Sequence, residues 1–434
     1  MGVVVRGNYV VPAGSIRAYS DPGPAIDMEG DTQRSYTVTN KGSLKVSWTG
    51  SSVGVVDDTF GYGDVSAFFH NAKSGLLSVT STANGAVGFA TGPHSVGLTN
   101  DGAIRTTALQ GLGYGVYGLG EWQDGDFKFL NNGSVQTSAW LAWGVELNHS
   151  EFDNRGSIVA KGYSTLAYQT GAIGAEIYAP RGPIINSGTI TAQNVAHGAH
   201  SVGVIIAQGP AIELDNSGTI SGDVAVKSGG SDSSNITINN TGVLNGGIDL
   251  SSNAGLDVVN NAGKITGDVH LNQQNPTGGS YNGSGGEISG TVFGTSGADL
   301  LSGGKLSDNL SGGAGNDRLA GGPGQDSLTG GLGNDTFAFA AVKESAVAHP
   351  DRITDFTSGE DVIDLSAIDA DSKTPGHQGF HLGATPGHTG DLVVTYDSAH
   401  ARTVIDLYVN NDTKADAEIW LSGHQTLGPG DFIL

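Results

Sequence analysis

Cysteine is absent from the 434 residues, and methionine occurs only twice. The chain therefore has no disulfide scaffold, no thiolate zinc site and no cysteine nucleophile. Basic residues are also scarce, since 20 Lys and Arg stand against 43 Asp and Glu, which gives a formal net charge of −23. An anionic excess of this size argues against nucleic acid as a partner, because the phosphate backbone would be repelled.

Long hydrophobic runs are missing as well. No stretch approaches the roughly 20 apolar residues that a membrane-spanning helix needs, so we expect no transmembrane segment. Residues 1–6 (MGVVVR) have no basic region, and Arg6 interrupts the apolar run before it reaches the length of a signal peptide. Taken alone, this N-terminus predicts a cytoplasmic protein, and the C-terminal motifs argue against that interpretation.

Glycine is abundant, with 71 residues, and much of it falls in a repeated pattern, Asn-x-Gly-x-aliphatic. The eight copies begin at Asn40, Asn100, Asn131, Asn154, Asn186, Asn216, Asn240 and Asn261. Successive copies are 21 to 32 residues apart, except for a first gap of 60 that an imperfect copy at Asn71 nearly bisects. A fixed step of this size is typical of solenoid folds.

Each copy predicts a turn followed by an inward-facing strand. Asn tolerates the left-handed backbone region and Gly occupies it without steric cost, while stacked asparagines can hydrogen-bond from coil to coil. Short alternating segments such as 201–206 (SVGVII) lie between the turns, so each coil should hold three short strands of a parallel β-helix. Roughly residues 30 to 290 resemble β-helical passenger segments of bacterial surface proteins. A disordered Gly/Ser-rich stretch is the less favoured alternative, because the aliphatic residues recur in phase.

Five consecutive nonapeptides follow, starting at Gly294, Gly303, Gly312, Gly321 and Gly330. The sixth residue of each is aspartate, namely Asp299, Asp308, Asp317, Asp326 and Asp335. The eighth is apolar, namely Leu301, Leu310, Leu319, Leu328 and Phe337. The second copy departs from the pattern, with Leu306 in place of a glycine.

These nonapeptides resemble the RTX, or haemolysin-type, calcium-binding repeat GGxGxDxUx, which forms a β-roll. Ca²⁺ takes six to eight oxygen ligands, and glycine-rich turns can aim several carbonyls at one point. The family pattern implies carbonyl ligands at the first and third positions and a carboxylate at the sixth, with each ion between repeats two apart. The implied metal ligands are Gly294, Ser296, Asp299, Gly303, Lys305, Asp308, Gly312, Ala314, Asp317, Gly321, Pro323, Asp326, Gly330, Leu332 and Asp335.

The C-terminal segment is similar to the domain that follows the repeats in serralysin-type proteins. The segments that carry this resemblance are 351–356 (DRITDF), 359–366 (GEDVIDLS) and the terminal 431–434 (DFIL). The resemblance implies an uncleaved C-terminal signal that a type I secretion machine reads. Residues 294–434 hold 20 acidic and 7 basic residues, so this third of the chain carries −13 of the total charge. We therefore expect this region to stay unfolded until calcium neutralises it outside the cell.

No catalytic motif is convincing. The chain contains no His-Glu dipeptide, which excludes the HExxH helix of a zinc protease. Parallel β-helices also host polysaccharide lyases and epimerases, for which the candidate groups are His149, Glu151, Asp153 and Arg155, or His197 and His200 near Arg181. Segment 60–64 (FGYGD) only echoes the signature of secreted alginate epimerases. We favour exposed polar residues on solenoid turns for all of these, and predict no catalytic residue and no organic cofactor.

Two further features have a functional and a structural interpretation. Aromatic residues gather between Tyr114 and Phe152, namely Tyr117, Trp122, Phe127, Phe129, Trp140 and Trp143. They could form a sugar-binding platform, but core filling or an end cap is favoured, because solenoid ends expose strand edges. Residues 410–418 (NNDTKADAE) could be a calcium turn, but without glycines a polar hairpin turn is favoured.

The predicted fold is all-β, with an N-terminal arm (1–30), a parallel β-helix (31–293), a calcium-bound RTX β-roll (294–338) and a β-rich type I secretion domain (339–434). The predicted function is that of a calcium-dependent structural or adhesive protein, such as a surface layer, matrix fibre or adhesin. It would lie outside the cell or on the surface of a Gram-negative bacterium. The expected partners are calcium, the type I machinery, and either further copies of the chain or a surface polysaccharide. The alternatives are a secreted polysaccharide lyase or epimerase and, more weakly, a cytolytic toxin.

Overall fold

The computed structural model is built almost entirely of β-strands, as the sequence predicts. It describes residues 3–5, 8–19, 24–28, 36–48, 50–57, 67–82, 84–91, 95–119, 127–166, 169–196, 198–230, 233–371, 373–383 and 387–434. The chain divides into two compact units, residues 1–236 with 242–246, and residues 237–241 with 247–434. Within the described ranges, no helix has the length and apolar character to cross a membrane.

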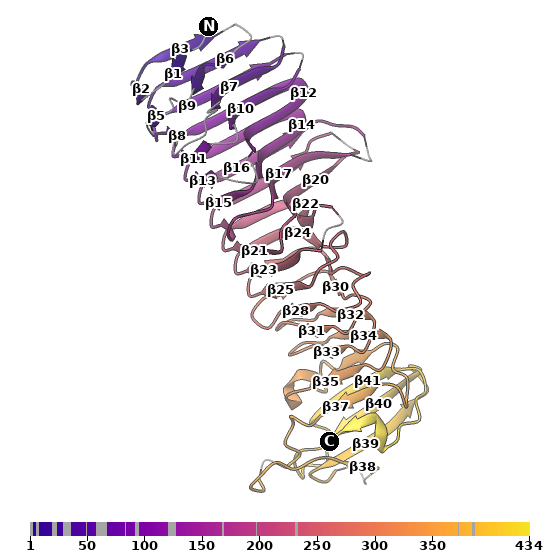
Figure 1. Cartoon of the computed structure of the whole chain (residues 1–434). Helices are drawn as coiled ribbons and strands as arrows, with labels where there is room; N and C mark the ends of the chain where they lie inside the picture. Colours follow the sequence, from indigo (N-terminus) through magenta and orange to yellow (C-terminus); the bar gives the residue numbers. More distant parts are fainter. Residues whose placement is uncertain are drawn as a thin grey trace. The chain divides into compact units, whose positions relative to one another are not determined.

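The first unit is a stack of coils in which the described strands of successive coils pair in parallel (Figure 1). One ribbon consists of β2 (Tyr9–Val11), β5 (Tyr36–Asn40), β8 (Ala67–Asn71), β11 (Ser95–Asn100), β13 (Phe127–Asn131), β15 (Ser150–Asn154), β18 (Ile184–Asn186) and β21 (Ala211–Asn216). The remaining strands are β1 (Val3–Val5), β3 (Ile16–Tyr19), β4 (Ile26–Met28), β6 (Ser43–Trp48), β7 (Ser52–Asp57), β9 (Leu76–Ser81), β10 (Ala86–Thr91), β12 (Ala103–Leu119), β14 (Ser134–Asn148), β16 (Ser157–Gly162), β17 (Thr170–Tyr178), β19 (Thr189–Asn194), β20 (His200–Ala207) and β22 (Thr219–Ser228).

Each coil of this unit supplies three strand segments, which confirms the predicted parallel β-helix. The coil that begins with β15 continues through β16 to β17, and these strands pair with β18, β19 and β20 of the following coil. Strands β12 and β14 run through one corner without a break, so their two halves pair with different neighbours.

A continuous asparagine ladder runs through the unit on the inside of the turns. Each side-chain amide donates to the amide oxygen of its counterpart in the next coil, at 2.7–2.9 Å. The members are Asn40, Asn71, Asn100, Asn131, Asn154, Asn186 and Asn216, all buried. Asn71 is a full member, so the imperfect copy in the sequence does complete the first long gap.

The core lies between the ribbons and is filled by the aliphatic residue of each repeat. Leu44, Ile104, Val135 and Ile158 are fully buried, as expected for strands whose alternate side chains face inward. One corner instead stacks glycine on glycine. A Cβ on Gly144 would lie 2.4 Å from both the Gly174 carbonyl oxygen and an Ile158 methyl carbon, so no side chain fits there.

The first 30 residues take part in the same architecture where they are described. Strand β1 pairs with β4, β2 with β5, and β3 with β6, always in parallel. The described residues of the predicted N-terminal arm therefore form a first coil of the β-helix. They pair with the next coil, which an unattached arm would not do.

The second unit begins around β23 (Asn235–Asn240) and β24 (Val243–Asp249), which straddle the division of the chain. One ribbon of it consists of β25 (Asp257–Asn261), β28 (Ser280–Asn282), β31 (Leu300–Ser302), β33 (Arg318–Ala320), β35 (Thr336–Ala338), β37 (Val362–Asp364) and β42 (Phe432–Ile433). The other elements are β26 (Lys264–Ile265), β27 (Val269–His270), β29 (Glu287–Ile288), β30 (Thr291–Phe293), β32 (Asn309–Ala314), β34 (Ser327–Leu332), β36 (Asp351–Ile353), β38 (His381–Leu382), β39 (Asp391–Asp397), β40 (Arg402–Leu407), β41 (Ala417–Ser422) and the short 3-10 helices η1 (Val342–Ser345) and η2 (Pro429–Asp431).

The coil of this unit narrows from three strands to two after β30. From there Leu301 pairs with Leu319, and Leu319 pairs with Phe337, so the repeat is 18 residues. This is the two-nonapeptide turn of a β-roll. The eighth-position side chains Leu301, Leu310, Leu319, Leu328 and Phe337 are at most 1% exposed and fill the roll.

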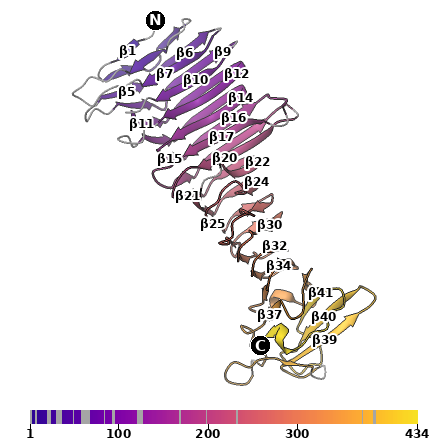
Figure 2. The same ribbon diagram turned by 45° about the vertical axis from the view of Figure 1, so that its right-hand side comes forward.

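The C-terminal part is an antiparallel sheet joined to the roll. Strand β40 pairs antiparallel with β39 and β41, while β41 also pairs in parallel with β36 (Figure 2). The last strand, β42, pairs in parallel with β37, so the terminal residues belong to the ribbon that contains the repeats.

We expect replacement of one ladder asparagine to destabilise the first unit far more than replacement of its neighbour. Asn131→Ala removes two buried amide hydrogen bonds, one from Asn100 and one to Asn154, and leaves polar partners unsatisfied at a cost of about 1–3 kcal/mol. The exposed side chain of Asn132 donates one hydrogen bond, to Asp101, so Asn132→Ala should cost less than about 0.5 kcal/mol. Urea denaturation followed by circular dichroism measures both, and equal midpoints would contradict the ladder's structural role.

Candidate cation-binding aspartate columns

The sixth-position aspartates of the repeats form two columns inside the second unit. From the third repeat on, each carboxylate accepts a hydrogen bond from the backbone N–H of the aspartate one coil before it. Asp317 Oδ1 accepts from Asp299 at 2.8 Å and Asp335 Oδ1 accepts from Asp317 at 2.9 Å. In the second column, Asp326 Oδ1 accepts from Asp308 at 2.8 Å.

Both columns continue beyond the nonapeptides. Asp351 Oδ1 accepts from the Asp326 N–H at 2.8 Å, and Asp361 Oδ1 accepts from the Asp335 N–H at 2.9 Å. The regular nine-residue count misses these two, because residues 339–350 interrupt it. Their local sequences, DRI and DVI, repeat the Asp-x-apolar element of the nonapeptide and could have identified them.

The second oxygen of most of these carboxylates is buried and has no hydrogen-bond partner among the described residues. This is true of Asp308 Oδ1 and of Oδ2 in Asp317, Asp326, Asp335 and Asp351. A buried carboxylate oxygen without a hydrogen bond or a cation is strongly unfavourable. Five such atoms in two columns make this part of the chain a candidate site for a cation.

The electrostatics of the columns lead to the same conclusion. Burial raises the pKa of Asp317 and Asp326 to about 7, and neighbouring aspartates add to the shift. Burial, together with Asp326 and Glu344, raises the pKa of Asp351 to about 8. The bare columns therefore resist ionisation, and a cation or a proton relieves the repulsion.

The first glycine of a repeat lies where carboxylate and carbonyl oxygens converge. A Cβ on Gly312 would be 2.1 Å from Asp317 Oδ2 and 2.6 Å from the Gly330 carbonyl oxygen. A Cβ on Gly303 would similarly be 2.2 Å from the Gly321 carbonyl oxygen and 2.7 Å from Asp308 Oδ2. The structure thus brings together the first- and sixth-position groups that the sequence pairs, and their all-oxygen chemistry fits a hard cation such as Ca²⁺.

Two of the third-position residues, Ala314 and Leu332, form backbone hydrogen bonds with a neighbouring coil. The Leu332 carbonyl accepts a hydrogen bond from the Gly315 N–H at 2.7 Å, and Ala314 donates its own N–H to the Thr295 carbonyl at 3.2 Å. Lys305 lies in the turn before β32 and Pro323 in the turn before β34. No group of three or more His, Cys, Asp or Glu side chains that could hold a metal occurs in the described part of the chain.

The first repeat differs from the others at its second position, where Thr295 replaces glycine. The Thr295 hydroxyl lies 2.9 and 3.1 Å from the two Asp299 carboxylate oxygens, and the Thr295 N–H donates at 2.6 Å. The Gly279 N–H donates to the same carboxylate. Asp299 is thus satisfied by protein groups alone. A cavity of about 230 Å³ lies beside it, lined by Gln273, Phe293, Gly294, Thr295, Ser296, Ser311, Gly313 and Ala314.

Among the described residues, the candidate catalytic groups of the β-helix lie in separate contacts, although burial, with a contribution from the Arg181 charge, lowers the pKa of His149. Glu151 pairs with Lys128 at 3.0 Å and Asp153 with Arg155 at 2.6 Å, both on the exposed surface. His149 is buried between β14 and β15, with a φ of 50°. His200 is exposed at the start of β20, whereas His197 and the segment 60–64 lie outside the described residues.

The aromatic cluster is divided between two environments. Phe127, Phe129 and Phe152 are buried in the coil interior, which confirms core filling for these three. Tyr114, Tyr117 and Trp143 are only partly buried, as is Trp140, and Trp122 is outside the described residues.

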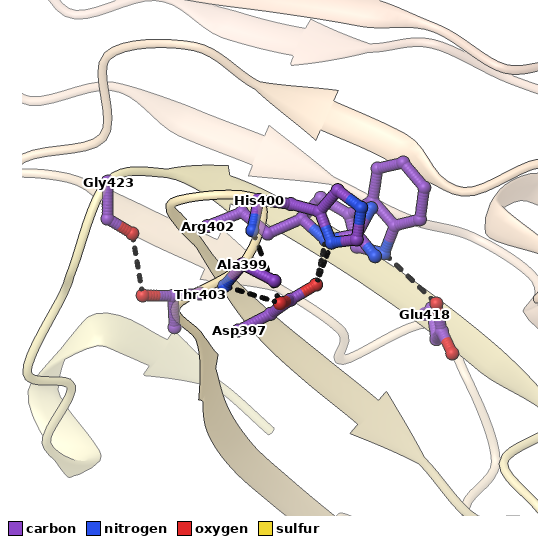
Figure 3. Close-up of polar contacts among 8 residues, drawn as sticks. Asp397, Ala399, His400, Arg402, Thr403, Glu418 and Gly423 are labelled. Atoms are coloured by element: carbon purple, nitrogen blue, oxygen red, sulfur yellow. Dashed lines mark hydrogen bonds and ion pairs between the residues drawn. The ribbon is translucent and has the colours of Figure 1, made fainter.

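The C-terminal sheet contains a polar cluster that is complete without a ligand (Figure 3). Asp397 accepts hydrogen bonds from His400 Nδ1 at 2.7 Å and from Arg402 Nε at 3.0 Å, and the bond with His400 is the main cause of the lowered pKa of Asp397. The Arg402 guanidinium lies 3.6 Å from the ring centroid of Trp420, whose indole N–H donates to Glu418. This cluster closes the hairpin of β39 and β40.

The segment 410–418 forms a hairpin turn between β40 and β41, as favoured from its sequence. Asn410 donates to Asp416 at 2.6 Å, and Asp416 accepts from the Val409 N–H at 2.8 Å. These internal bonds account for the polar residues of the turn.

Comparison with known proteins supports the serralysin resemblance for the C-terminal third. Residues 286–434 match the family model described as the C-terminal domain of the serralysin-type M10 peptidases. Metalloprotease AprA of Pseudomonas entomophila (strain L48) is 44% identical over 80 residues, which are 18% of this chain and 16% of that protein. Serralysin A of Dickeya chrysanthemi is 36% identical over 98 residues, 23% of this chain and 20% of that protein.

Solved structures similar to the chain include two subunits of the mannuronan C5-epimerase of Azotobacter vinelandii. The AlgE6R3 subunit is 27% identical, with a TM-score of 0.24, over 39% of this chain and 77% of its own. The AlgE6R2 subunit is 26% identical, with a TM-score of 0.26, over 41% of this chain and 91% of its own. The chain covers no more than a fifth of the two curated proteases, and its match to them is confined to a segment of at most 98 residues.

In a chelator, we expect mild acid to order the aspartate columns in place of a cation. The folded-state pKa values of about 7 to 8 lie above the ordinary value of 3.8, so the folded form binds protons that the unfolded form releases. Stability should therefore rise as pH falls from about 8 toward 4, and be lost as pH rises through the same window. Circular dichroism in EDTA at pH 8 and pH 5 measures this, and an unchanged spectrum would contradict it.

Proposed function

We propose that the chain is a type I-secreted extracellular protein with a structural or adhesive role, whose C-terminal unit folds on binding calcium. The observation that carries the proposal is the pair of aspartate columns with five buried, unpartnered carboxylate oxygens. Calcium supplies the positive charge that these oxygens need, and a calcium-rich exterior supplies the ion.

Calcium would be held between coils two repeats apart. The best-supported ligand sets combine Asp317 with the Gly330 carbonyl, and Asp308 with the Gly321 carbonyl, because these oxygens already converge on one glycine. The other predicted ligands follow the same spacing. Asp299 is the weakest candidate, because Thr295 already occupies both of its oxygens.

Secretion by a type I machine is supported by the serralysin-type match over residues 286–434. In the folded unit the terminal Phe432 is 7% exposed and Asp431 is 3% exposed. The Asp431 carboxylate accepts hydrogen bonds from the N–H groups of Gly359 and Gly428 at 2.8 and 2.7 Å. A machine that reads this terminal tag would meet it before the unit folds, in the calcium-poor cell.

The structural or adhesive role is supported by the β-helix itself. Of its candidate catalytic groups, Glu151, Asp153 and Arg155 take part in separate surface ion pairs and His149 is buried, while its repeated coils present a regular surface. The Gram-negative hosts of the two matching proteases are in keeping with an exterior or cell-surface location. Self-assembly through coil ends, with calcium bridging acidic surfaces, is the mode that we propose for such a protein.

We expect the C-terminal unit to be unfolded in chelator at pH 8 and to order in millimolar calcium. Asp317→Asn removes a column carboxylate and should raise the calcium concentration at half-transition at least about tenfold, equivalent to about 1.4 kcal/mol. Asp412→Asn, in the exposed β40–β41 turn, removes the same charge outside the columns and should leave that concentration unchanged. Calcium titration followed by circular dichroism and limited proteolysis measures both, and a chelator-insensitive spectrum would refute calcium-dependent folding.

We also expect purified protein to form ordered assemblies in millimolar calcium and to disperse in chelator. Calcium would order the C-terminal unit and screen the charge of −23 that keeps copies apart. Negative-stain electron microscopy and light scattering under both conditions measure this. Monomers in both would count against self-assembly while leaving calcium-dependent folding to the titration above.

A further inference from the structure

A group of aromatic and carboxyl side chains gathers on the outside of the first unit. We call it the aromatic–carboxyl face, and it consists of Tyr114, Tyr117, Trp143, Glu146, Glu176 and Tyr178. Strand register brings the group together, because Tyr114 pairs with Trp143, Tyr117 with Glu146, and Glu146 with Glu176 across β12, β14 and β17. These residues are up to 64 positions apart in the chain, so only coil stacking makes them neighbours.

The face points away from the coil interior. Val145 and Leu147 are fully buried on either side of Glu146, and Ala175 and Ile177 are fully buried on either side of Glu176. Because side chains alternate along a strand, the two glutamates project outward. All six members are partly exposed, so a ligand in solution can reach them.

The aromatic rings form a wall along the coil axis. Tyr114 and Trp143 stack with ring centroids 5.0 Å apart and an interplanar angle of 22°, and Tyr117 lies 5.1 Å from Tyr114. A buried group at one end, made by Ile173, Val202 and Ile205, packs against Trp143 and fixes its ring. The wall is therefore rigid and apolar on its flat surfaces.

The two glutamates of the face have different environments. Both carboxylate oxygens of Glu176 accept hydrogen bonds, one from Trp143 Nε1 at 2.7 Å and the other from the Tyr178 hydroxyl. Glu146 lies directly opposite, and among the described residues no hydrogen bond or ion pair reaches its carboxyl group. Burial, with a contribution from the charge of Glu176, raises the pKa of Glu146 to about 7.

A third acceptor lies beside this pair. Asn148 is opposite Tyr178 in register, and its amide oxygen is buried with no hydrogen-bond partner among the described residues. The face thus presents the Glu146 carboxyl group next to a second carboxylate, with the amide oxygen of Asn148 alongside. Like charges placed directly opposite each other in a sheet are destabilising, so a positively charged hydrogen-bond donor between them would relieve the repulsion.

We propose that the aromatic–carboxyl face binds an amino-sugar residue of a polysaccharide, with its ammonium group between Glu146 and Glu176 and its ring against Tyr114 and Trp143. Ammonium groups bind well beside aromatic rings and carboxylates. The flat C–H surface of a sugar ring matches the wall of stacked rings, whereas a lysine side chain has no such surface. The carboxyl pair repels uronate polymers.

This site goes beyond the proposed function, since it requires neither calcium nor secretion and names a ligand class. It would make the β-helix the part of the chain that recognises a surface, independent of whether the C-terminal unit folds as proposed.

The test is calorimetric titration of the full chain, in millimolar calcium at pH 7 and 0.15 M salt, with two hexasaccharides. A hexamer of glucosamine carries ammonium groups, and a hexamer of N-acetylglucosamine has the same rings without them. We expect the glucosamine hexamer to bind at least tenfold more tightly. A lysine hexapeptide is the control for general attraction to an acidic protein, and should bind at least tenfold more weakly than the glucosamine hexamer.

Matched variants place the site. Glu146→Gln and Glu176→Gln should each weaken glucosamine binding at least tenfold, while Glu151→Gln, on the exposed ion pair with Lys128, should leave it unchanged. Glu146→Gln removes a like-charge repulsion, so it should fold at least as stably as the parent chain, which circular dichroism checks. Equal binding of the two hexamers, equal binding of the lysine peptide, or equal weakening by Glu151→Gln would each overturn the proposal.

Discussion

Parallel, in-register stacking of coils is the constraint on which the whole chain depends. Each strand lies over its counterpart in the preceding coil, so a residue type that recurs at the step of the coil is brought into a column. Backbone hydrogen bonds set the spacing between coils, so identical side chains in a column lie about 4.8 Å apart. Whether such a column can satisfy its own hydrogen bonds and charges depends on the chemistry of its side chains.

Asparagine and glycine columns are self-sufficient, and carboxyl columns are not. An amide both donates and accepts, so Asn131 receives a bond from Asn100 and gives one to Asn154. Glycine lets the backbones approach at the corner of β14 and β17. A carboxylate only accepts hydrogen bonds, which leaves Asp317 and Asp335 each with an oxygen that no group in the described part of the chain satisfies. The same argument applies to Glu146 opposite Glu176, and it is why both candidate sites are places where the stack is incomplete.

The sequence predicts the columns that keep a regular step and misses those that do not. The Asn-x-Gly pattern and the nonapeptides reveal the asparagine ladder and the 18-residue coil, because turn chemistry and aliphatic positions repeat together. Asp351 and Asp361 escape the count because η1 and its flanking turns are inserted between them and the last repeat. The aromatic–carboxyl face cannot be predicted from the sequence, because its members share no motif. They meet only through the pairing of β12 with β14, whose register shifts between Ala108 and Leu112. Asp299 is the opposite case, in which the repeat pattern predicts a cation ligand. Thr295 stands there in place of a glycine and gives the Asp299 carboxylate hydrogen bonds within the chain.

The fold of the second unit links the end of the aspartate columns to the end of the chain. The turn of residues 357–361 holds both, because Asp361 accepts from the N–H groups of Asp335 and Thr357, while Ser358 and Gly359 donate to Asp431. The columns and the terminal residues therefore share one turn of the folded unit. If a cation neutralises the columns, as proposed above, burial of the terminal residues in β42 would depend on that cation through this turn. A calcium-poor compartment would then leave the terminal segment exposed, which is the state in which a secretion machine would have to recognise it.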